Sequence, residues 1–233
     1  MAGSVIPALL VSFVVWLMVP SRNDSLIARI SSLKEYRSSF LNLMRNRVLL
    51  LLIITMSLKS IGEGAVGAFL TLYMREDLNY SFGKVALFIS FGQIAGIVTL
   101  PVMGFLSDKI GRKPILVTGL VISMVSALLL IVAEPGYQLF LVVLSRGSLA
   151  ISLHHIFMAA ALDVAKGATQ STVVSLIYGA GFLGTFSPYV AGLISDRYGI
   201  HSTFLYGGSI MIFPIILLVF TNINRSQTSK TND

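Results

Sequence analysis

Long apolar runs are the feature of this sequence that most limits how the chain can fold. A run of about 18 or more apolar residues is long enough to cross the hydrocarbon core of a bilayer as a helix. Inside that core every backbone N–H and C=O must be paired within its own segment, which a helix achieves. The sequence predicts seven such spans, at approximately residues 2–19, 47–74, 84–106, 114–134, 137–163, 170–194 and 202–222.

The composition agrees with this fold class. Of the 233 residues, 55% are hydrophobic and only 12% are charged, a balance outside the range of ordinary soluble domains. We therefore predict an all-α, polytopic membrane protein that has the lipid bilayer as a partner. Cysteine is absent, which excludes disulfides, thiolate nucleophiles and thiolate metal sites. No nucleotide-binding loop of the G-x-x-x-x-G-K-[ST] kind is present, and we predict neither a cofactor nor a metal site.

The net charge of +7 could indicate a nucleic-acid partner, but the positions of the basic residues favour a membrane topology instead. Most of the 17 Lys and Arg residues lie in alternate connections, as the positive-inside rule requires of cytoplasmic loops. The opposite connections hold only Arg75, Lys84 and Arg197. We predict a multi-pass protein of the cell membrane, with residues 21–46 and the C-terminus in the cytoplasm. The basic residues assigned to the cytoplasm are Arg22, Arg29, Lys34, Arg37, Arg45, Arg47, Lys109, Arg112, Lys113, Lys166, Arg225 and Lys230.

The segments outside the last six spans give three further expectations. Residues 1–20 form the first transmembrane helix, and without a basic segment before it or a clear cleavage site it does not resemble a signal peptide. We therefore expect a chain shortened at its N-terminus. Residues 21–46 are either a linker with an amphipathic helix lying along the membrane or a solvated linker without fixed structure. Residues 223–233 form a cytoplasmic tail.

A short motif occurs twice within the last six spans. The stretch GFLSDKIG at 104–111 returns as GLISDRYG at 192–199, an offset of 88 residues. Because three spans separate the copies, they face opposite sides of the membrane. We predict an inverted repeat of three plus three helices, an arrangement that many secondary transporters share. The residues common to the two copies are Gly104, Ser107, Asp108 and Gly111 in the first and Gly192, Ser195, Asp196 and Gly199 in the second.

The first copy resembles a motif of a known transporter family. The signature G-x-x-x-D-x-x-G-R-[RK] of the major facilitator superfamily is matched at all its fixed positions, by Gly104, Asp108, Gly111, Arg112 and Lys113. The resemblance implies secondary active transport of a small solute by alternating access, coupled to a proton or to a counter-solute. It also implies that residues 47–222 are a six-helix C-terminal half. The first span would then be the last helix of a missing N-terminal half, which a separate partner could provide.

The sequence leaves a second function open. A non-transporting membrane fragment, or an interaction subunit that needs a partner half, would show the same spans and the same motif. An enzyme is the weakest alternative, because no pair of a nucleophile and a base, and no metal cluster, stands out at one depth. We therefore predict no enzymatic activity, and nothing in the sequence identifies the small-molecule substrate.

The signature residues have a physical role in this resemblance. Asp108 can pair with Arg112, while Gly104 and Gly111 allow a close approach and a tight turn of the backbone. Arg112 and Lys113 hold the turn on the cytoplasmic side. In the family this turn is implicated in holding the cytoplasmic face closed. The alternative role is a topology anchor that does not switch.

Ionisable residues inside the spans are candidates for a substrate or coupling site. Each costs about 2.5–3.5 kcal/mol at a helix centre, so such residues persist mainly where they face a cavity or one another. Lys59 and Glu63 lie one turn apart in the second span, and Arg146 and His154 lie in the fifth. Glu63 and Arg146 share a depth, and we predict that they bridge in one conformation. The alternatives are a self-neutralising Lys59–Glu63 pair and a packed, hydrogen-bonded His154.

Overall fold

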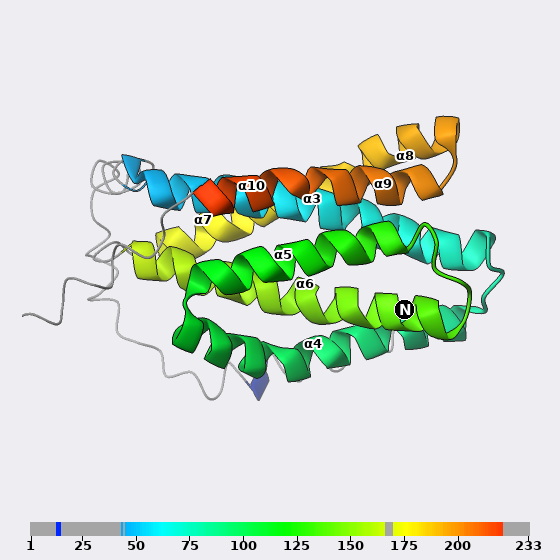
Figure 1. Cartoon of the computed structure of the whole chain (residues 1–233), viewed down its shortest axis with the longest axis horizontal. Coiled ribbons are helices and arrows are strands. Elements are labelled where there is room, and N and C mark those ends of the chain that lie inside the picture. The colour runs from blue at the N-terminus through cyan, green and yellow to red at the C-terminus, as the bar shows by residue number, and fades with distance from the viewer. Residues whose placement is uncertain (1–12, 15–42, 44, 166–169, 221–233) are drawn as a thin grey trace, which may run out of the picture. The chain divides into compact units, whose positions relative to one another are not determined.

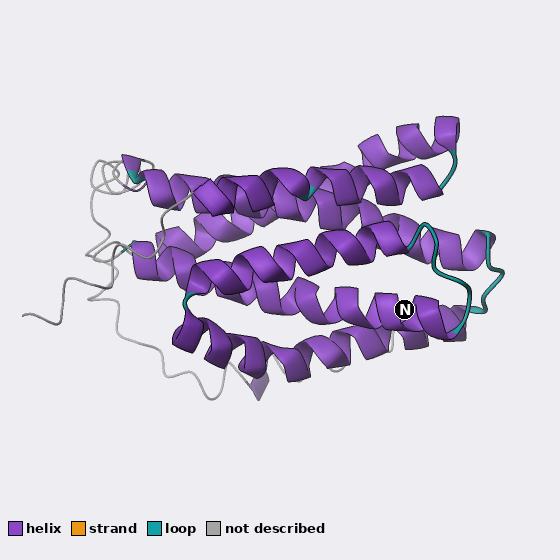
Figure 2. Cartoon of the chain, in the orientation of Figure 1, coloured by secondary structure: helices purple, strands orange, loops and turns teal. Residues whose placement is uncertain are grey.

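The computed structural model describes residues 13–14, 43, 45–165 and 170–220. These residues are almost entirely helical, as Figures 1 and 2 show. The elements that follow residue 46 are α3 (Arg47–Glu76), α4 (Phe82–Ile110), α5 (Arg112–Leu129), α6 (Tyr137–Val164), α7 (Gln170–Phe182), η3 (Leu183–Phe186), α8 (Ser187–Tyr198), α9 (His201–Ile210) and α10 (Ile212–Phe220).

Six helical stretches of the described region are long and apolar enough to cross a membrane. Each of α3, α4, α5 and α6 is one such stretch, while α7, η3 and α8 together form the fifth and α9 and α10 the sixth. They coincide with the six spans predicted between residues 47 and 222, which confirms an all-α, polytopic membrane protein. The predicted first span falls outside the described residues except for Phe13 and Val14. Most of the 21–46 linker and all of the 223–233 tail also fall outside them.

The two copies of the repeated motif end their helices in the same way. Gly111 follows α4 with a φ of 106°, and Gly199 follows α8 with a φ of 82°, a region that favours glycine. The N–H of each donates to the carbonyl four residues earlier, that of Ser107 at 3.1 Å and that of Ser195 at 2.8 Å. In Figure 1 the α4–α5 turn and the α8–α9 turn lie at opposite ends of the helices, as an inverted repeat requires.

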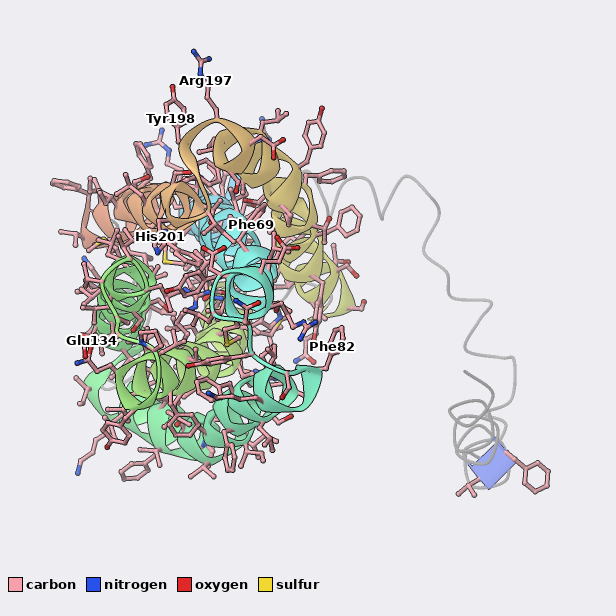
Figure 3. All side chains as sticks on the ribbon, turned by 90° about the vertical axis from the view of Figure 1, so that its right-hand side faces the viewer. Phe69, Phe82, Glu134, Arg197, Tyr198 and His201 are labelled. Atoms are coloured by element: carbon pink, nitrogen blue, oxygen red, sulfur yellow. The ribbon has the colours of Figure 1, made fainter. Side chains whose placement is uncertain are left out.

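Figure 3 looks along the helices from the α8–α9 end. Phe82 at the start of α4, Glu134 in the connection between α5 and α6, and His201 at the start of α9 are labelled there. Three separate connections therefore lie at one end of the bundle, as the alternation of spans predicts.

Glycines bring α4 and α6 into close contact. A Cβ added at Gly147 of α6 would lie 2.5 Å from the Cα of Gly92, and one at Gly96 would lie 3.0 Å from the carbonyl oxygen of Gly147. The pair Gly92 and Gly96 is a G-x-x-x-G spacing, which places two small residues on one face of a helix. Close backbone approach therefore fixes α6 against α4.

The buried apolar residues form two clusters at different depths, and α3 and α6 contribute to both. On α3 the first cluster ends at Met56 and the second begins at Val66. On α6 the second cluster ends at Val143 and the first begins again at Leu149. Between these limits the buried residues of the two helices are Lys59, Gly62 and Ala65 on α3 and Arg146 on α6. This layer separates the clusters, and it contains the charged residues described below.

The helices differ in how much of their surface the rest of the bundle covers. In the most apolar 18-residue stretch of α4, only 17% of the residues are buried by the rest of the bundle. The corresponding share is 28% for the α7–α8 span and 39% for each of the other four spans. Large apolar side chains are exposed on these two spans, such as Ile97 and Phe105 on α4 and Phe186 at the end of η3. Two faces of the bundle are thus left to contact lipid or another protein.

Candidate functional site

Lys59 and Glu63 form an ion pair on α3, in the layer between the two apolar clusters. Lys59 is 1% exposed, and its Nζ donates a hydrogen bond of 2.6 Å to Oε2 of Glu63 one turn later. The second carboxylate oxygen of Glu63, Oε1, is buried and has no hydrogen-bond partner among the described residues. Glu63 therefore uses one oxygen for Lys59 and keeps the other free for a second interaction.

Arg146 lies in the same layer on α6. It is 8% exposed, and no described residue accepts a hydrogen bond from it or lies within ion-pair distance of it. A guanidinium buried in this way normally finds a carboxylate or another acceptor, because leaving it unpaired in an apolar region is costly. The direct bridge between Glu63 and Arg146 that the sequence predicts is not formed in this conformation, in which Glu63 bonds Lys59 instead.

A cavity of about 250 Å³ joins Glu63 to Arg146. It lies between α3, α4 and α6, and both charged residues belong to its wall, whereas Lys59 and His154 do not. The wall is otherwise mainly apolar, which is typical of sites for small organic molecules. The lining residues are Glu63, Gly67, Leu70, Ile89, Gly92, Gln93, Val143, Arg146, Gly147, Ala150 and Ile151.

His154 occupies a different place, where α6 faces α7. Its ring lies 5.2 Å from the ring of Tyr178 and 3.9 Å (Cε1) from a Cβ added at Gly181. Its Nε2 is buried and has no hydrogen-bond partner in the described part of the chain. His154 is therefore packed against its neighbours, but its Nε2 makes no hydrogen bond within the described residues. It does not line the cavity that contains Glu63 and Arg146.

Gln93 is a lining residue that the sequence analysis missed. It belongs to α4, a span without charged residues in its interior, and among the described lining residues it contributes the one side-chain amide. The sequence feature that could have identified Gln93 is the G-x-x-x-G pair, because Gln93 directly follows Gly92 of that pair, which contacts α6. Its position next to a helix contact places it close to the elements that carry the charged residues.

The signature turn is held by Arg112, the first residue of α5. Its Nη2 lies 2.7 Å from Oδ1 of Asp108 on α4, and its Nε donates to Oδ2 of Asp163 on α6 at 3.0 Å. Its Nη1 donates to Oγ of Ser107 at 2.5 Å. One guanidinium therefore connects α4, α5 and α6, and the sequence analysis had named only Asp108 of its three partners.

The remaining signature residues differ from one another in their contacts. The Nζ of Lys113 donates to the carbonyl oxygen of Val219 at 2.7 Å, which links α5 to the end of α10. Gly111 makes the turn described above. The expectation of a close approach at Gly104 is wrong for the described residues, because a Cβ added there would meet nothing within 4 Å.

The second copy of the motif lacks the ion cluster of the first. Asp196 is exposed, and no ion pair involves it in the described ranges. Ile200 stands where the first copy has Arg112, so the aspartate has no cation on the next turn. Gly192 lies against Phe69, with an added Cβ 3.8 Å from the ring. The helix-ending turn made by Ser195 and Gly199 is the geometry that this copy repeats in the described residues.

Comparison with known proteins connects these features to a family. The model of the Major Facilitator Superfamily matches residues 52–233, which includes every site residue described above. The chain belongs to the Major Facilitator Superfamily. Membership in this family of transporters supports the prediction that the chain is not an enzyme.

Three similar proteins within the superfamily carry names that refer to drug resistance. Multidrug resistance protein MdtG of Enterobacter lignolyticus is 25% identical over 196 residues, which cover 79% of this chain and 44% of MdtG. MdtG of Escherichia fergusonii is 26% identical over 219 residues, covering 89% of this chain and 52% of that protein. Multi-drug resistance efflux pump PmrA of Streptococcus pneumoniae is 29% identical over 150 residues, covering 62% of this chain and 37% of PmrA. The chain spans about half the length of these superfamily relatives or less.

Proposed function

We propose that this chain forms one six-helix half of a secondary transporter that moves a small organic solute across the cell membrane by alternating access. The observation that carries the proposal is the cavity between α3, α4 and α6, whose wall combines the partly buried Glu63 and the buried Arg146 with apolar side chains. Charged groups persist inside a membrane mainly where they serve a solute or ion path. The names of the MdtG and PmrA relatives favour a drug-like organic compound as the solute.

Glu63 is the proposed coupling residue. Its Oε2 bonds Lys59, while its buried Oε1 faces no partner and its side chain lines the cavity with Arg146. A carboxylate with a cation on each side can exchange partners when the helices move, or bind a proton when one cation turns to another anion. We propose that Glu63 leaves Lys59 for Arg146 in a second conformation, and that a proton or counter-solute drives this exchange.

Arg112 is the proposed latch of the cytoplasmic face. The side chains of Asp108 and Asp163 are 66% and 42% exposed, so each ion pair with Arg112 is well solvated. Solvated ion pairs contribute only about 0–1 kcal/mol each. A contact of this strength can hold three helix ends in register and still break in every transport cycle, as alternating access requires.

The missing wall of the transporter is proposed to cover α4 and the α7–α8 stretch. These are the two spans that the described bundle covers least. In this proposal residues 1–20 are the last helix of an N-terminal half, residues 21–46 link the halves in the cytoplasm, and the C-terminus is also cytoplasmic. The basic residues of the linker and of the Arg112 turn support this orientation.

The experiment compares this chain with the complete transporter, which contains both six-helix halves. Each is reconstituted in liposomes, and uptake of a panel of labelled anionic, cationic and neutral organic compounds is measured with and without a pH gradient. We expect saturable, gradient-dependent uptake by the complete transporter and none by the chain alone. Saturable uptake by a demonstrated monomer of the chain would contradict the proposal that it is one half.

The coupling role is tested in the same assay by replacing Glu63 with Gln. We expect uptake to lose its dependence on the gradient, because the variant has no carboxylate to protonate. The double variant Lys59→Met with Glu63→Gln removes the pair without leaving a buried cation and should also be uncoupled. Glu134→Gln changes an exposed carboxylate in a connection and serves as the matched control. Unchanged gradient dependence in both Glu63 variants would rule out the coupling role.

A further inference from the structure

We propose that Arg146 binds the carboxylate, or another oxyanion, of an amphipathic solute in the cavity between α3, α4 and α6. The inference deepens the proposed function by naming the class of its substrate, and as a statement about transport it rests on that function. The proposed solute is therefore an organic anion.

The charges of the cavity layer leave a cation without a counter-charge. Lys59 and Arg146 are both more than nine-tenths buried, and Glu63 is the one carboxylate beside them in the described bundle. The other acidic residues of the described ranges lie at or near helix ends, as Asp108 and Asp163 do. Because Lys59 already holds Glu63 at 2.6 Å, the layer carries one uncompensated positive charge.

The geometry of Arg146 suits an anion from outside the described bundle. Its guanidinium has no hydrogen bond to any described residue, although the side chain forms part of the cavity wall. Guanidinium groups present parallel N–H donors that match a carboxylate or phosphate group in two simultaneous hydrogen bonds. An oxyanion in the cavity would satisfy these donors and neutralise the charge.

The rest of the wall indicates that the anion is amphipathic. Leu70, Ile89, Val143 and Ile151 surround the polar residues with apolar surface, while Gln93 offers an amide. A bare inorganic anion would leave this apolar surface in contact with water. An aromatic or aliphatic carboxylate places its charged group at Arg146 and its body against these side chains, as small-molecule sites commonly require.

The test uses three compounds of similar size and different charge: benzoate, benzylamine and benzyl alcohol. Binding of each labelled compound is measured by a scintillation proximity assay on purified chain and on the purified complete transporter. We expect benzoate to bind to both, and the cationic and neutral compounds to bind at least about tenfold more weakly, because they cannot pair with a buried guanidinium. Equal binding of benzylamine or benzyl alcohol would overturn the proposal.

Substitutions assign the effect to Arg146. Arg146→Gln should weaken benzoate binding by about 30-fold or more, the usual effect of removing one partner of a buried charge pair. Arg146→Lys keeps the charge but loses the paired donors, so its loss should be intermediate. Glu63→Gln removes the competing carboxylate and should tighten binding, an effect that misfolding cannot produce. Arg197→Gln, at an exposed arginine that points away from the helices in Figure 3, is the control and should leave binding unchanged.

The two preparations distinguish the sources of the oxyanion. Binding of benzoate to both, with loss in Arg146→Gln, supports a solute anion. Binding to the chain but not to the complete transporter would overturn it, since a carboxylate of the other half would then occupy Arg146. The proposed function can fail independently of this inference. If the complete transporter binds benzoate through Arg146 but transports nothing, the transport function is refuted and the anion site stands. If it transports a solute but does not bind benzoate, only the anion site is refuted.

Discussion

Replacing Glu63 by Gln should destabilise the folded chain mainly because of the cation that it leaves behind. Lys59 is 1% exposed, and the Oε2 of Glu63 at 2.6 Å is the one acceptor that its Nζ has in the described bundle. A glutamine can accept one hydrogen bond from the ammonium but cannot neutralise it. The variant therefore holds an uncompensated charge between two apolar clusters.

The expected magnitude follows from the burial of each partner. Breaking a buried ion pair from one side costs about 3–5 kcal/mol, and insertion scales assign about 2.5–3.5 kcal/mol to a single charge at mid-membrane depth. We therefore expect Glu63→Gln to lower the free energy of unfolding by about 3 kcal/mol. Lys59→Met leaves a carboxylate whose side chain is 18% exposed and shares a cavity with Arg146, so a smaller loss of about 1–2 kcal/mol is expected.

The double variant Lys59→Met with Glu63→Gln removes both charges together. Replacing a whole buried ion pair by uncharged side chains of similar size is often close to neutral. We expect a loss of about 1 kcal/mol or less, which corresponds to a coupling energy of about 3 kcal/mol between the two residues. The free energies are measured by reversible unfolding of the purified chain in mixed micelles titrated with a denaturing detergent.

A matched cycle uses Lys109→Met and Glu134→Gln, two exposed residues at different ends of the helices. Their effects should add. If the losses in Lys59→Met and Glu63→Gln also add to within about 0.5 kcal/mol, the pair contributes nothing as a pair and the argument from burial is wrong. A third cycle, Glu63→Gln with Arg146→Gln, should give a smaller coupling of the same sign, because these two share a cavity but form no ion pair in this conformation.

Two further predictions concern the helix contacts around the site. Arg112→Ala and Asp163→Asn should reach the membrane at normal levels in the complete transporter, but they should increase the labelling of single cysteines introduced at the C-terminal end of α4, a region that has no native cysteine. Unchanged labelling with normal transport would leave Arg112 as a topology anchor. Gly147→Ala should lower the stability of the chain by about 1–3 kcal/mol in the same unfolding assay, because its Cβ would lie 2.5 Å from Gly92, whereas Gly179→Ala, where a Cβ meets nothing within 4 Å, should be tolerated.

The fold could be predicted from the sequence because each span is a local property. A run of apolar residues identifies a membrane helix without knowledge of its neighbours, and the six runs after residue 46 each became a helical stretch. The contact between Asp108 and Arg112 was predictable for the same reason, since residues four apart on a continuous turn of chain lie close together. The pair Lys59–Glu63 follows the same spacing.

Contacts between distant parts of the chain were not predictable in this way. Asp163 lies 51 residues from Arg112, and nothing in the residues around either one identifies the other as its partner. The depth shared by Glu63 and Arg146 could be counted along the chain, and the G-x-x-x-G pair indicated a helix contact beside Gln93. That three helices leave a cavity at this contact could not be predicted. The sequence predicted a bridge between Glu63 and Arg146 in one conformation, but the pairing of Glu63 with Lys59 in this conformation came from the structure.

The inverted repeat shows that backbone symmetry and chemical symmetry are separate. Gly111 and Gly199 end their helices in the same conformation, so the two copies present equivalent turns at opposite ends of the bundle. Among the described residues the ion cluster occurs at the Arg112 end and not around Asp196, because Ile200 occupies the position of Arg112. A device that held both ends with the same strength would leave a transporter without a preferred closed side. Under the proposed function, Arg112 contacts at one end alone would give this half a preferred closed side, which solute binding and movement of Glu63 would have to overcome.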